Sequence, residues 1–360
     1  HSNNTATMFS IIDSEATVNG ELIVGVGTPG GSSLVKFNSS GDTLWSKSYS
    51  GIVPASIEFS NISEVSDGTI YTVKSSGANF QCRQLNSQGD IQWGHDYNFS
   101  LSSAYSEPVS VANGLNLVFA IGSMSDTLVC GEIDAAGNNI WTYKVSLLPL
   151  FGASANNMIT LDEIDVLNNG NYIITGWASS DIGITDYNFM MEISSAGTVS
   201  WVKTLERETG LVGNISVADL AVATNGDILM SGDINYNGVY GAFINRYDSN
   251  GNRIWSKFMA NGGNSTQVTE LSNGEIIIHV NGTSLTSDGS FKIGLIKLDA
   301  SGNYIWGRAF GLSMNMGIGD VVEDINGNIM AVASSNISGM AALLVYNTDI
   351  NGNATGCVDV

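Results

Sequence analysis

The acidic side chains are the residues of this chain with the clearest potential for catalysis. The densest group is Asp162, Glu163 and Asp165 in the segment LDEIDV. Two carboxylates held at a suitable separation can hydrolyse a glycosidic bond. If this segment is a strand that lines a channel, alternate acids will face the channel. The competing interpretation is a set of solvated or turn-associated acids.

Histidine and cysteine are too scarce to complete other catalytic sites. The three histidines are His1, His95 and His279, so no Ser or Cys triad can be assembled. His279 lies in the apolar run EIIIHV, which favours a hydrogen-bonded core residue over a catalytic base. No paired spacing suggests zinc. We therefore predict no catalytic residue and no metal ligand, and we expect Cys82, Cys130 and Cys357 to be free and mostly buried thiols.

Calcium is the one cofactor for which the sequence offers a partial motif. Asp248, Asn250 and Asn252 in DSNGN resemble the opening of an oxygen-rich calcium loop, and DINGN and DINGNATG repeat it near residues 324 and 349. The loop's Gly at position 6 and its bidentate Glu at position 12 are missing. Asx turns explain the same residues without a metal, and both interpretations stay open.

Charge and composition exclude several classes of partner. The chain has 13 Lys and Arg against 34 Asp and Glu, a formal net charge of −21. Too few cations are present to bind nucleic acid or an anionic membrane surface. No apolar stretch approaches the roughly 20 residues of a membrane-spanning helix. With 42 Gly and 4 Pro, the composition is typical of a β protein, and we expect it to be secreted, extracellular or attached to a cell surface.

Two interleaved series of turns divide the chain into seven units. Asn-Gly or Asp-Gly before an apolar strand predicts a tight hairpin, which we expect to be of type I′. Between these turns lie sequences such as DSNGNRIW. Each unit therefore predicts four antiparallel strands, and stacking the units around an axis predicts an all-β, seven-bladed β-propeller in one domain, residues 1–360. The glycines of the first series are Gly20, Gly68, Gly114, Gly170, Gly226, Gly274 and Gly327, and those of the second are Gly41, Gly89, Gly137, Gly197, Gly251, Gly302 and Gly352. The expected blades are 6–50, 51–99, 100–148, 149–206, 207–260, 261–311 and 312–360.

A tryptophan follows six of the second-series glycines by four residues, where its ring can pack between blades. These structural tryptophans are Trp45, Trp93, Trp141, Trp201, Trp255 and Trp306. The seventh unit has Gly356 or Cys357 at this place. Near the tryptophans lies a basic residue or histidine, whose stem we expect to lie along the indole rather than to form a functional cationic ring. This set is Lys47, His95, Lys144, Lys203, Lys257 and Arg308.

The DxxGxxxW pattern of INRYDSNGNRIWSK and LIKLDASGNYIWGR resembles the β-propeller repeats of bacterial secreted and cell-surface proteins, notably those of Bacteroidetes. The resemblance covers nearly the whole chain, and it implies adhesion, recognition or scaffolding. Quinoprotein dehydrogenases share only the Gly-to-Trp motif. Sialidases differ in the spacing of their Asp box and need an arginine cluster. Neither activity carries over.

Variable loops predict the binding surface. The short turns lie on one face of the disc, and the longer loops, which vary in length, emerge on the other. The candidate ligand-binding residues there are Trp177, Asp181, Asp186, Tyr187 and Tyr236, together with the apolar segment LLPLF at 147–151. The alternative is that Trp177 only covers a blade edge.

Our leading hypothesis is a non-catalytic extracellular recognition or adhesion module that binds a glycan or a protein partner. The alternatives are a secreted carbohydrate-active enzyme with paired carboxylates, and a structural subunit of a surface appendage. The sequence leaves the ligand and the oligomeric state open.

Overall fold

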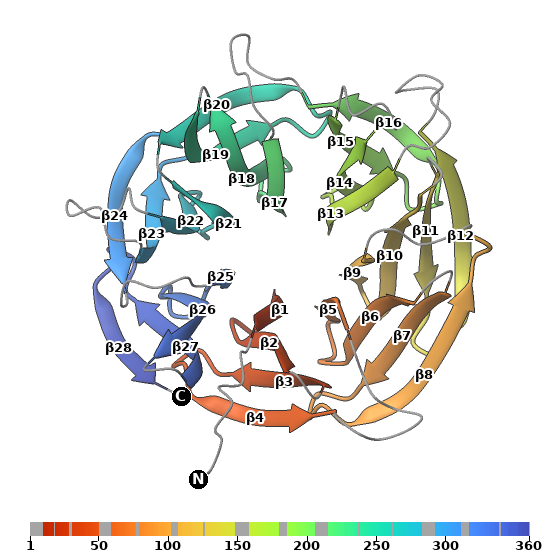
Figure 1. Ribbon diagram of the computed structural model, residues 1–360, viewed down its shortest axis with the longest axis horizontal. Coiled ribbons are helices and arrows are strands. Elements are labelled where there is room, and N and C mark those ends of the chain that lie inside the picture. Colours follow the sequence, from red (N-terminus) through yellow and green to blue (C-terminus); the bar gives the residue numbers. More distant parts are fainter. Residues whose placement is uncertain are drawn as a thin grey trace.

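Seven four-stranded sheets surround a central channel in the computed structural model (Figure 1). The structure describes residues 10–17, 19–28, 31–49, 59–76, 79–101, 107–124, 127–147, 158–179, 186–205, 215–236, 238–260, 262–282, 292–310, 317–337 and 340–359. In each sheet the first strand lies at the channel and the fourth at the rim. The seven-bladed β-propeller expected from the repeats is confirmed. Within these residues, no helix has the length and apolar character needed to cross a membrane.

Each blade consists of four consecutive antiparallel strands, and their bounds follow blade by blade. Blades 1 to 4 contain β1 (Ser10–Ala16), β2 (Leu22–Thr28), β3 (Gly31–Phe37), β4 (Thr43–Ser48); β5 (Asn61–Glu64), β6 (Ile70–Ser76), β7 (Asn79–Leu85), β8 (Ile91–Asn98); β9 (Val109–Asn113), β10 (Asn116–Gly122), β11 (Thr127–Ile133), β12 (Asn139–Ser146); and β13 (Met158–Val166), β14 (Tyr172–Ser179), β15 (Asp186–Ile193), β16 (Val199–Thr204). Blades 5 to 7 contain β17 (Ile215–Val222), β18 (Ile228–Tyr236), β19 (Val239–Tyr247), β20 (Arg253–Ala260); β21 (Gly262–Glu270), β22 (Ile276–Gly282), β23 (Lys292–Leu298), β24 (Tyr304–Phe310); and β25 (Ile318–Glu323), β26 (Ile329–Ile337), β27 (Met340–Thr348), β28 (Ala354–Asp359).

The turns differ from the expected type I′ geometry. Type I′ requires a positive φ at both central residues, whereas among the described turn residues only the glycines have one. In the sixth blade, Gly274 has φ +82° and its N–H donates to the Leu271 carbonyl, while the Leu271 N–H donates to the Glu275 carbonyl. This is a type I turn closed by a left-handed glycine, and it explains why the preceding residue need not be Asn.

The hydrophobic core is divided into seven clusters, one between each pair of neighbouring blades. Between blades 4 and 5, for example, Met190 of β15 packs with Met230 of β18 and Phe243 of β19. Because both faces of every sheet are covered in this way, the sequences of the middle strands are nearly continuous runs of apolar residues. No blade can bury its faces without its neighbours.

The repeated tryptophans fill the rim side of these interfaces, as the sequence predicted. A Cβ atom added to Gly251 would lie 2.7 Å from the Trp201 ring, and one added to Gly197 would lie 2.6 Å from the Trp141 ring. In six of the seven second-series turns, the glycine therefore lets the tryptophan of the preceding blade pack close to the backbone, whereas Gly41 faces Val345 of blade 7, which lacks the tryptophan. The Lys203 ammonium lies over the Trp201 ring, 5.3 Å from its centroid, and donates to the Asn250 carbonyl and the Asn252 side chain, so this lysine packs at the indole as expected but its charge is bonded to the next blade.

Blade 7 closes the ring against blade 1 without a shared strand. Val345 and Met330 pack with Phe37 in the cluster between these blades. The Asn347 side chain donates to the Ser39 carbonyl at 2.7 Å. Side-chain packing and hydrogen bonds between two complete sheets therefore join the first and last blades.

Candidate functional site

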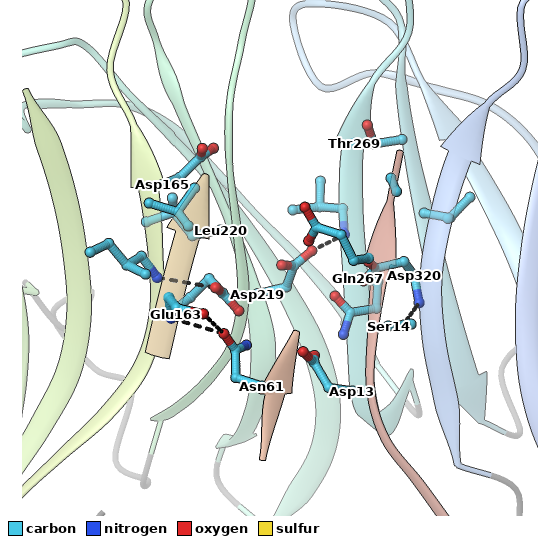
Figure 2. Close-up of a pocket in the computed structure, with 17 residues that line it drawn as sticks. Asp13, Ser14, Asn61, Glu163, Asp165, Asp219, Leu220, Gln267, Thr269 and Asp320 are labelled. Carbon is cyan, nitrogen blue, oxygen red and sulfur yellow. Dashed lines mark hydrogen bonds between the residues drawn. The ribbon is translucent and has the colours of Figure 1, made fainter. Parts of the chain in front are cut away.

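The acidic segment LDEIDV forms most of β13, the innermost strand of blade 4, as the sequence analysis required for a channel-lining role. Glu163 and Asp165 line a cavity in the channel (Figure 2). Asp162 is the extra residue of a β-bulge between Leu161 and Glu163 and is not part of the lining. Of the two interpretations that the sequence left open, the channel-lining one thus applies to Glu163 and Asp165, and the bulge at Asp162 could not be foreseen from the sequence.

The channel cavity has a volume of about 230 Å³ and an acidic wall. Its lining includes six carboxylates from four blades, and no Lys, Arg or His is among the residues that line it. These carboxylates belong to Asp13, Glu15, Glu163, Asp165, Asp219 and Asp320. Sequence reasoning missed the four outside β13. The signal was available, because Asp13, Asp219 and Asp320 each precede a first-series glycine by seven residues.

Several of these side chains hold neighbouring blades together. Oδ2 of Asp219 accepts a hydrogen bond from the Val268 backbone N–H at 2.6 Å. Oδ2 of Asp165 accepts one from the Val222 N–H at 2.9 Å. In the amide orientation that satisfies both of its polar atoms, the Gln267 side chain also donates to Asp219. The inner acids therefore satisfy the edges of adjacent inner strands, which lack a strand partner on the channel side.

The environment of the channel shifts all six pKa values in one direction. Burial raises the pKa of Asp13 to about 7 and that of Asp219 to about 8, although backbone hydrogen bonds lower both. Burial also raises the pKa of Asp165 to about 6. The pKa values of the other three acids lie well above their usual range because of burial and the nearby acids; these are Glu15, Glu163 and Asp320. Burial away from water is the largest cause for all six acids, and repulsion from nearby carboxylates adds to it for Glu15, Glu163, Asp219 and Asp320.

These properties do not match glycoside hydrolysis. That reaction needs one carboxylic acid and one carboxylate, whose environments push their pKa values apart. In this channel burial raises the pKa of every lining acid and none is lowered, and Asp165 and Asp219 already accept backbone hydrogen bonds. The cavity is also smaller than the roughly 300–1,000 Å³ typical of ligand pockets. The arrangement is suited to joining blades.

The predicted binding residues lie in blades 4 and 5, at the ends of strands that lead into the longer loops. Trp177 is half-buried near the end of β14. Asp186 and Tyr187 begin β15, and their backbones pair with Ser179 and Ala178. Tyr236 ends β18. Asp181 lies outside the described residues, as does the LLPLF segment beyond Leu147, which is itself buried in the core between blades 3 and 4. Leu147 therefore does not contribute to the loop surface on which the sequence placed this segment, because its side chain completes that core.

Trp177 faces the interface with blade 5. In β14, Ile173 belongs to the core between blades 4 and 5, and Ile174 belongs to the core between blades 3 and 4. Since strand side chains alternate, Trp177 shares the side of Ile173. Asn188 pairs with Trp177 across the sheet and shares the side of Met190, so it also faces blade 5.

Asn188 is a buried polar residue close to Trp177. Its side chain is 7% exposed, and its buried Oδ1 atom has no hydrogen-bond partner within the described part of the protein. An unpaired buried acceptor is costly, and such a group often binds water or a ligand. On blade 5, Val239 is 41% exposed at the tip of the β18–β19 hairpin, and Tyr240 is 61% exposed. Sequence reasoning did not select Asn188, Val239 or Tyr240.

The calcium-like turns form Asx turns in the structure. Oδ1 of Asp248 accepts hydrogen bonds from the N–H groups of Asn250 and Asn252, and Oδ2 accepts one from the Asn252 side chain at 2.9 Å. The turns at Asp324 and Asp349 have the same pattern. These bonds account for the repeated Asp and Asn. No cluster of three or more His, Cys, Asp or Glu suited to a metal occurs among the described residues.

His279 is a hydrogen-bonded core residue, as the apolar run predicted. It is fully buried, with Nδ1 2.7 Å from the Gly319 carbonyl and Nε2 bonded to the Tyr346 hydroxyl. Because a carbonyl can only accept, Nδ1 carries the proton and Nε2 accepts from Tyr346. Cys82 and Cys130 are free and buried, also as predicted, and the Cys357 side chain lies outside the described part of the structure.

Neither the known protein-family models nor the curated proteins contain a match to this sequence. Solved structures do share its fold. The Dos1 propeller aligns with a TM-score of 0.56 at 9% identity, over 99% of this chain and 87% of the other. A protein from Lactobacillus plantarum aligns with a TM-score of 0.57 at 12% identity, over 98% and 95% of the two chains.

The β-propeller domain of the Trilobed protease from Pyrococcus furiosus is also similar, with a TM-score of 0.50 at 8% identity over 96% of each chain. It is described as having an open velcro topology. Identities this low establish a common architecture and carry no activity across to this chain.

Proposed function

We propose that this chain is a non-catalytic recognition module that binds a glycan on its loop face, the face on which the longer loops of blades 4 and 5 emerge. One observation carries the proposal: the unpaired Oδ1 atom of Asn188 lies across the sheet from the half-buried indole of Trp177. A sugar hydroxyl can donate to this oxygen while the sugar ring stacks on the indole.

The exposed surface of blade 5 also supports this assignment. The apolar Val239 side chain is exposed on blade 5, on the side that faces blade 4, because it shares the side of Phe243. The channel acids, by contrast, serve to connect the blades. The resemblance to secreted and cell-surface propeller repeats, and the net charge of −21, support an extracellular or cell-surface location for such a module.

A glycan array tests the proposal directly. We expect the wild-type protein to bind a subset of glycans, and W177A and N188A to lose at least about tenfold in affinity, because each removes a direct contact. Y143A is the matched control. Tyr143 is 42% exposed on the rim strand β12, so its removal also deletes an exposed aromatic ring but leaves the loop face intact.

Retention of wild-type binding by both W177A and N188A would exclude this face of blades 4 and 5. If the array gives no signal but the protein captures a protein partner, and this binding requires Trp177, then the proposed binding face is correct and the proposed glycan ligand is wrong. Release of reducing sugar that depends on Glu163 would instead favour the carbohydrate-active enzyme.

A further inference from the structure

A second cavity lies at the outer rim between blades 5 and 6, and it shares no lining residue with the channel cavity. Its volume is about 360 Å³, within the range typical of small-ligand sites. β20 of blade 5 and β23 and β24 of blade 6 form its walls, and β20 and β24 are neighbouring outer strands of the ring (Figure 1). The floor is apolar and includes Ile296, Leu298 and Met259.

An exposed tyrosine forms one side of this rim cavity. Tyr304 pairs with Leu298 across the sheet and is 68% exposed. Its ring lies over Gly307, where an added Cβ would be 3.2 Å from the hydroxyl oxygen and 3.6 Å from Cε2. The absence of a side chain at Gly307 therefore keeps the space beneath the ring open.

A cation lies at the same cavity. Lys257 is part of the lining, and its stem crosses Gly302, where an added Cβ would be 2.8 Å from Cε. Within the described residues, the Lys257 ammonium makes no hydrogen bond or ion pair. The corresponding Lys203 of blade 4 donates to the Asn250 carbonyl and, at 2.9 Å, to the Asn252 side chain.

The charge of Lys257 acts on Asp299, but no hydrogen bond or ion pair joins the two side chains. Hydrogen bonds within its own turn, chiefly from Asn303, lower the pKa of Asp299 most, and the charge of Lys257 lowers it less. Its Oδ1 accepts from the N–H groups of Ser301 and Asn303, and its Oδ2 accepts from the Asn303 side chain. An apolar floor, one aromatic wall and one cation with free donors together define the ligand chemistry.

We propose that this cavity binds a small aromatic carboxylate, with its ring against Tyr304 and the apolar floor and its carboxylate on Lys257. Charge complementarity selects the carboxylate, since an anion can form an ion pair with Lys257 whereas a neutral ligand can only accept a hydrogen bond from it. The site is separate from the loop face and does not depend on the proposed glycan function.

The probe pair is 4-phenylbutyrate and 4-phenylbutanol, which differ in the anionic group. We expect 4-phenylbutyrate to shift the Met259 methyl resonance of protein labelled at the methionine methyls, saturably, and to bind at least about tenfold more tightly than the alcohol. K257Q should remove this preference. K203Q is the matched control and should leave it unchanged, because Lys203 is already bonded within its own rim interface.

G307V tests the cavity itself. Blade 4 has Val202 at the equivalent place, one residue after its tryptophan, so the substitution should fold, and a thermal melt checks this. It should abolish binding by filling the space under Tyr304. The proposal is overturned if the alcohol binds as tightly as the acid, if K257Q and G307V both bind normally, or if the Met259 resonance does not move.

Discussion

The Asp13 carboxylate of blade 1 accepts a hydrogen bond from the backbone N–H of Ile62 in blade 2, with Oδ2 and N 2.6 Å apart. Asn61 and Ser110 make the same bond between blades 2 and 3, and Asp219 and Val268 make it between blades 5 and 6. In each pair the partners are 49 residues apart. The repeat therefore reproduces one contact between successive inner strands, and it does so with either Asp or Asn as the acceptor.

Removing the acceptor in blade 5 should destabilise the ring. We expect D219A to lower the free energy of unfolding by about 1–3 kcal/mol, because it leaves the Val268 N–H without a partner. D219N should be at least as stable as the wild type, since it keeps an acceptor oxygen, as Asn61 does, and replaces a buried acid by a group that cannot ionise. Urea denaturation measures both. Equal losses for the two variants would show that the charge matters rather than the hydrogen bond.

Stability should fall between pH 6.5 and pH 8.5. The pKa values of Asp13 and Asp219 are raised in the folded protein to about 7 and about 8, from 3.8. The folded state thus holds protons that the unfolded state has released, and their stabilising effect is lost as the pH rises through the folded pKa. A lower melting temperature at pH 8.5 than at pH 6.5 is the expected result.

The control for this pH dependence is the double variant D13N/D219N. It keeps acceptors for Ile62 and Val268 but cannot titrate, so its melting temperature should change less over the same interval. His279 does not affect this comparison, because its pKa in the folded protein, about 4, lies well below pH 6.5. A wild-type melting temperature that rises with pH would contradict the buried-carboxylate description.

Two glycine substitutions separate backbone strain from interblade packing. Gly251 has φ +71° and Gly274 has φ +82°, so alanine at either position should cost about 1–2 kcal/mol from the left-handed backbone. Nothing lies within 4 Å of a Cβ at Gly274, whereas Trp201 lies 2.7 Å from one at Gly251. G251A should therefore cost about 1–3 kcal/mol more than G274A in chemical denaturation. Similar losses would mean that the tryptophan can move aside easily.

The His279 imidazole should stay neutral across the physiological range. Burial lowers its pKa to about 4, although the Gly319 carbonyl raises it. The ¹⁵N chemical shifts of this ring should show a proton on Nδ1 and no titration between pH 5 and pH 8. Protonation in that interval would contradict the hydrogen bond in which Nε2 accepts from Tyr346. Because the pKa of His279 is lower in the folded protein than in the unfolded chain, the unfolded state binds the proton first. The free energy of unfolding therefore decreases as the pH falls from about 6.5 toward 4.

The number of blades, the order of strands and the packing role of the tryptophans follow from the sequence alone. These features depend on residues close together in the chain. A glycine that must adopt a left-handed conformation and a tryptophan four residues later mark each turn without reference to the rest of the protein. The alternation of side chains left open whether the acids of 162–165 face the channel or the solvent, and the strand order places Glu163 and Asp165 at the channel.

The tertiary structure decided what those acids do and where ligand chemistry is available. The pKa of Asp219 depends on burial, on the Val268 N–H and on carboxylates from other blades, none of which a local pattern contains. The unpaired Asn188 oxygen and the open space beside Lys257 are likewise properties of two sheets in contact. They arise only when the ring closes, because each depends on how well side chains that are distant in the chain fill one interface.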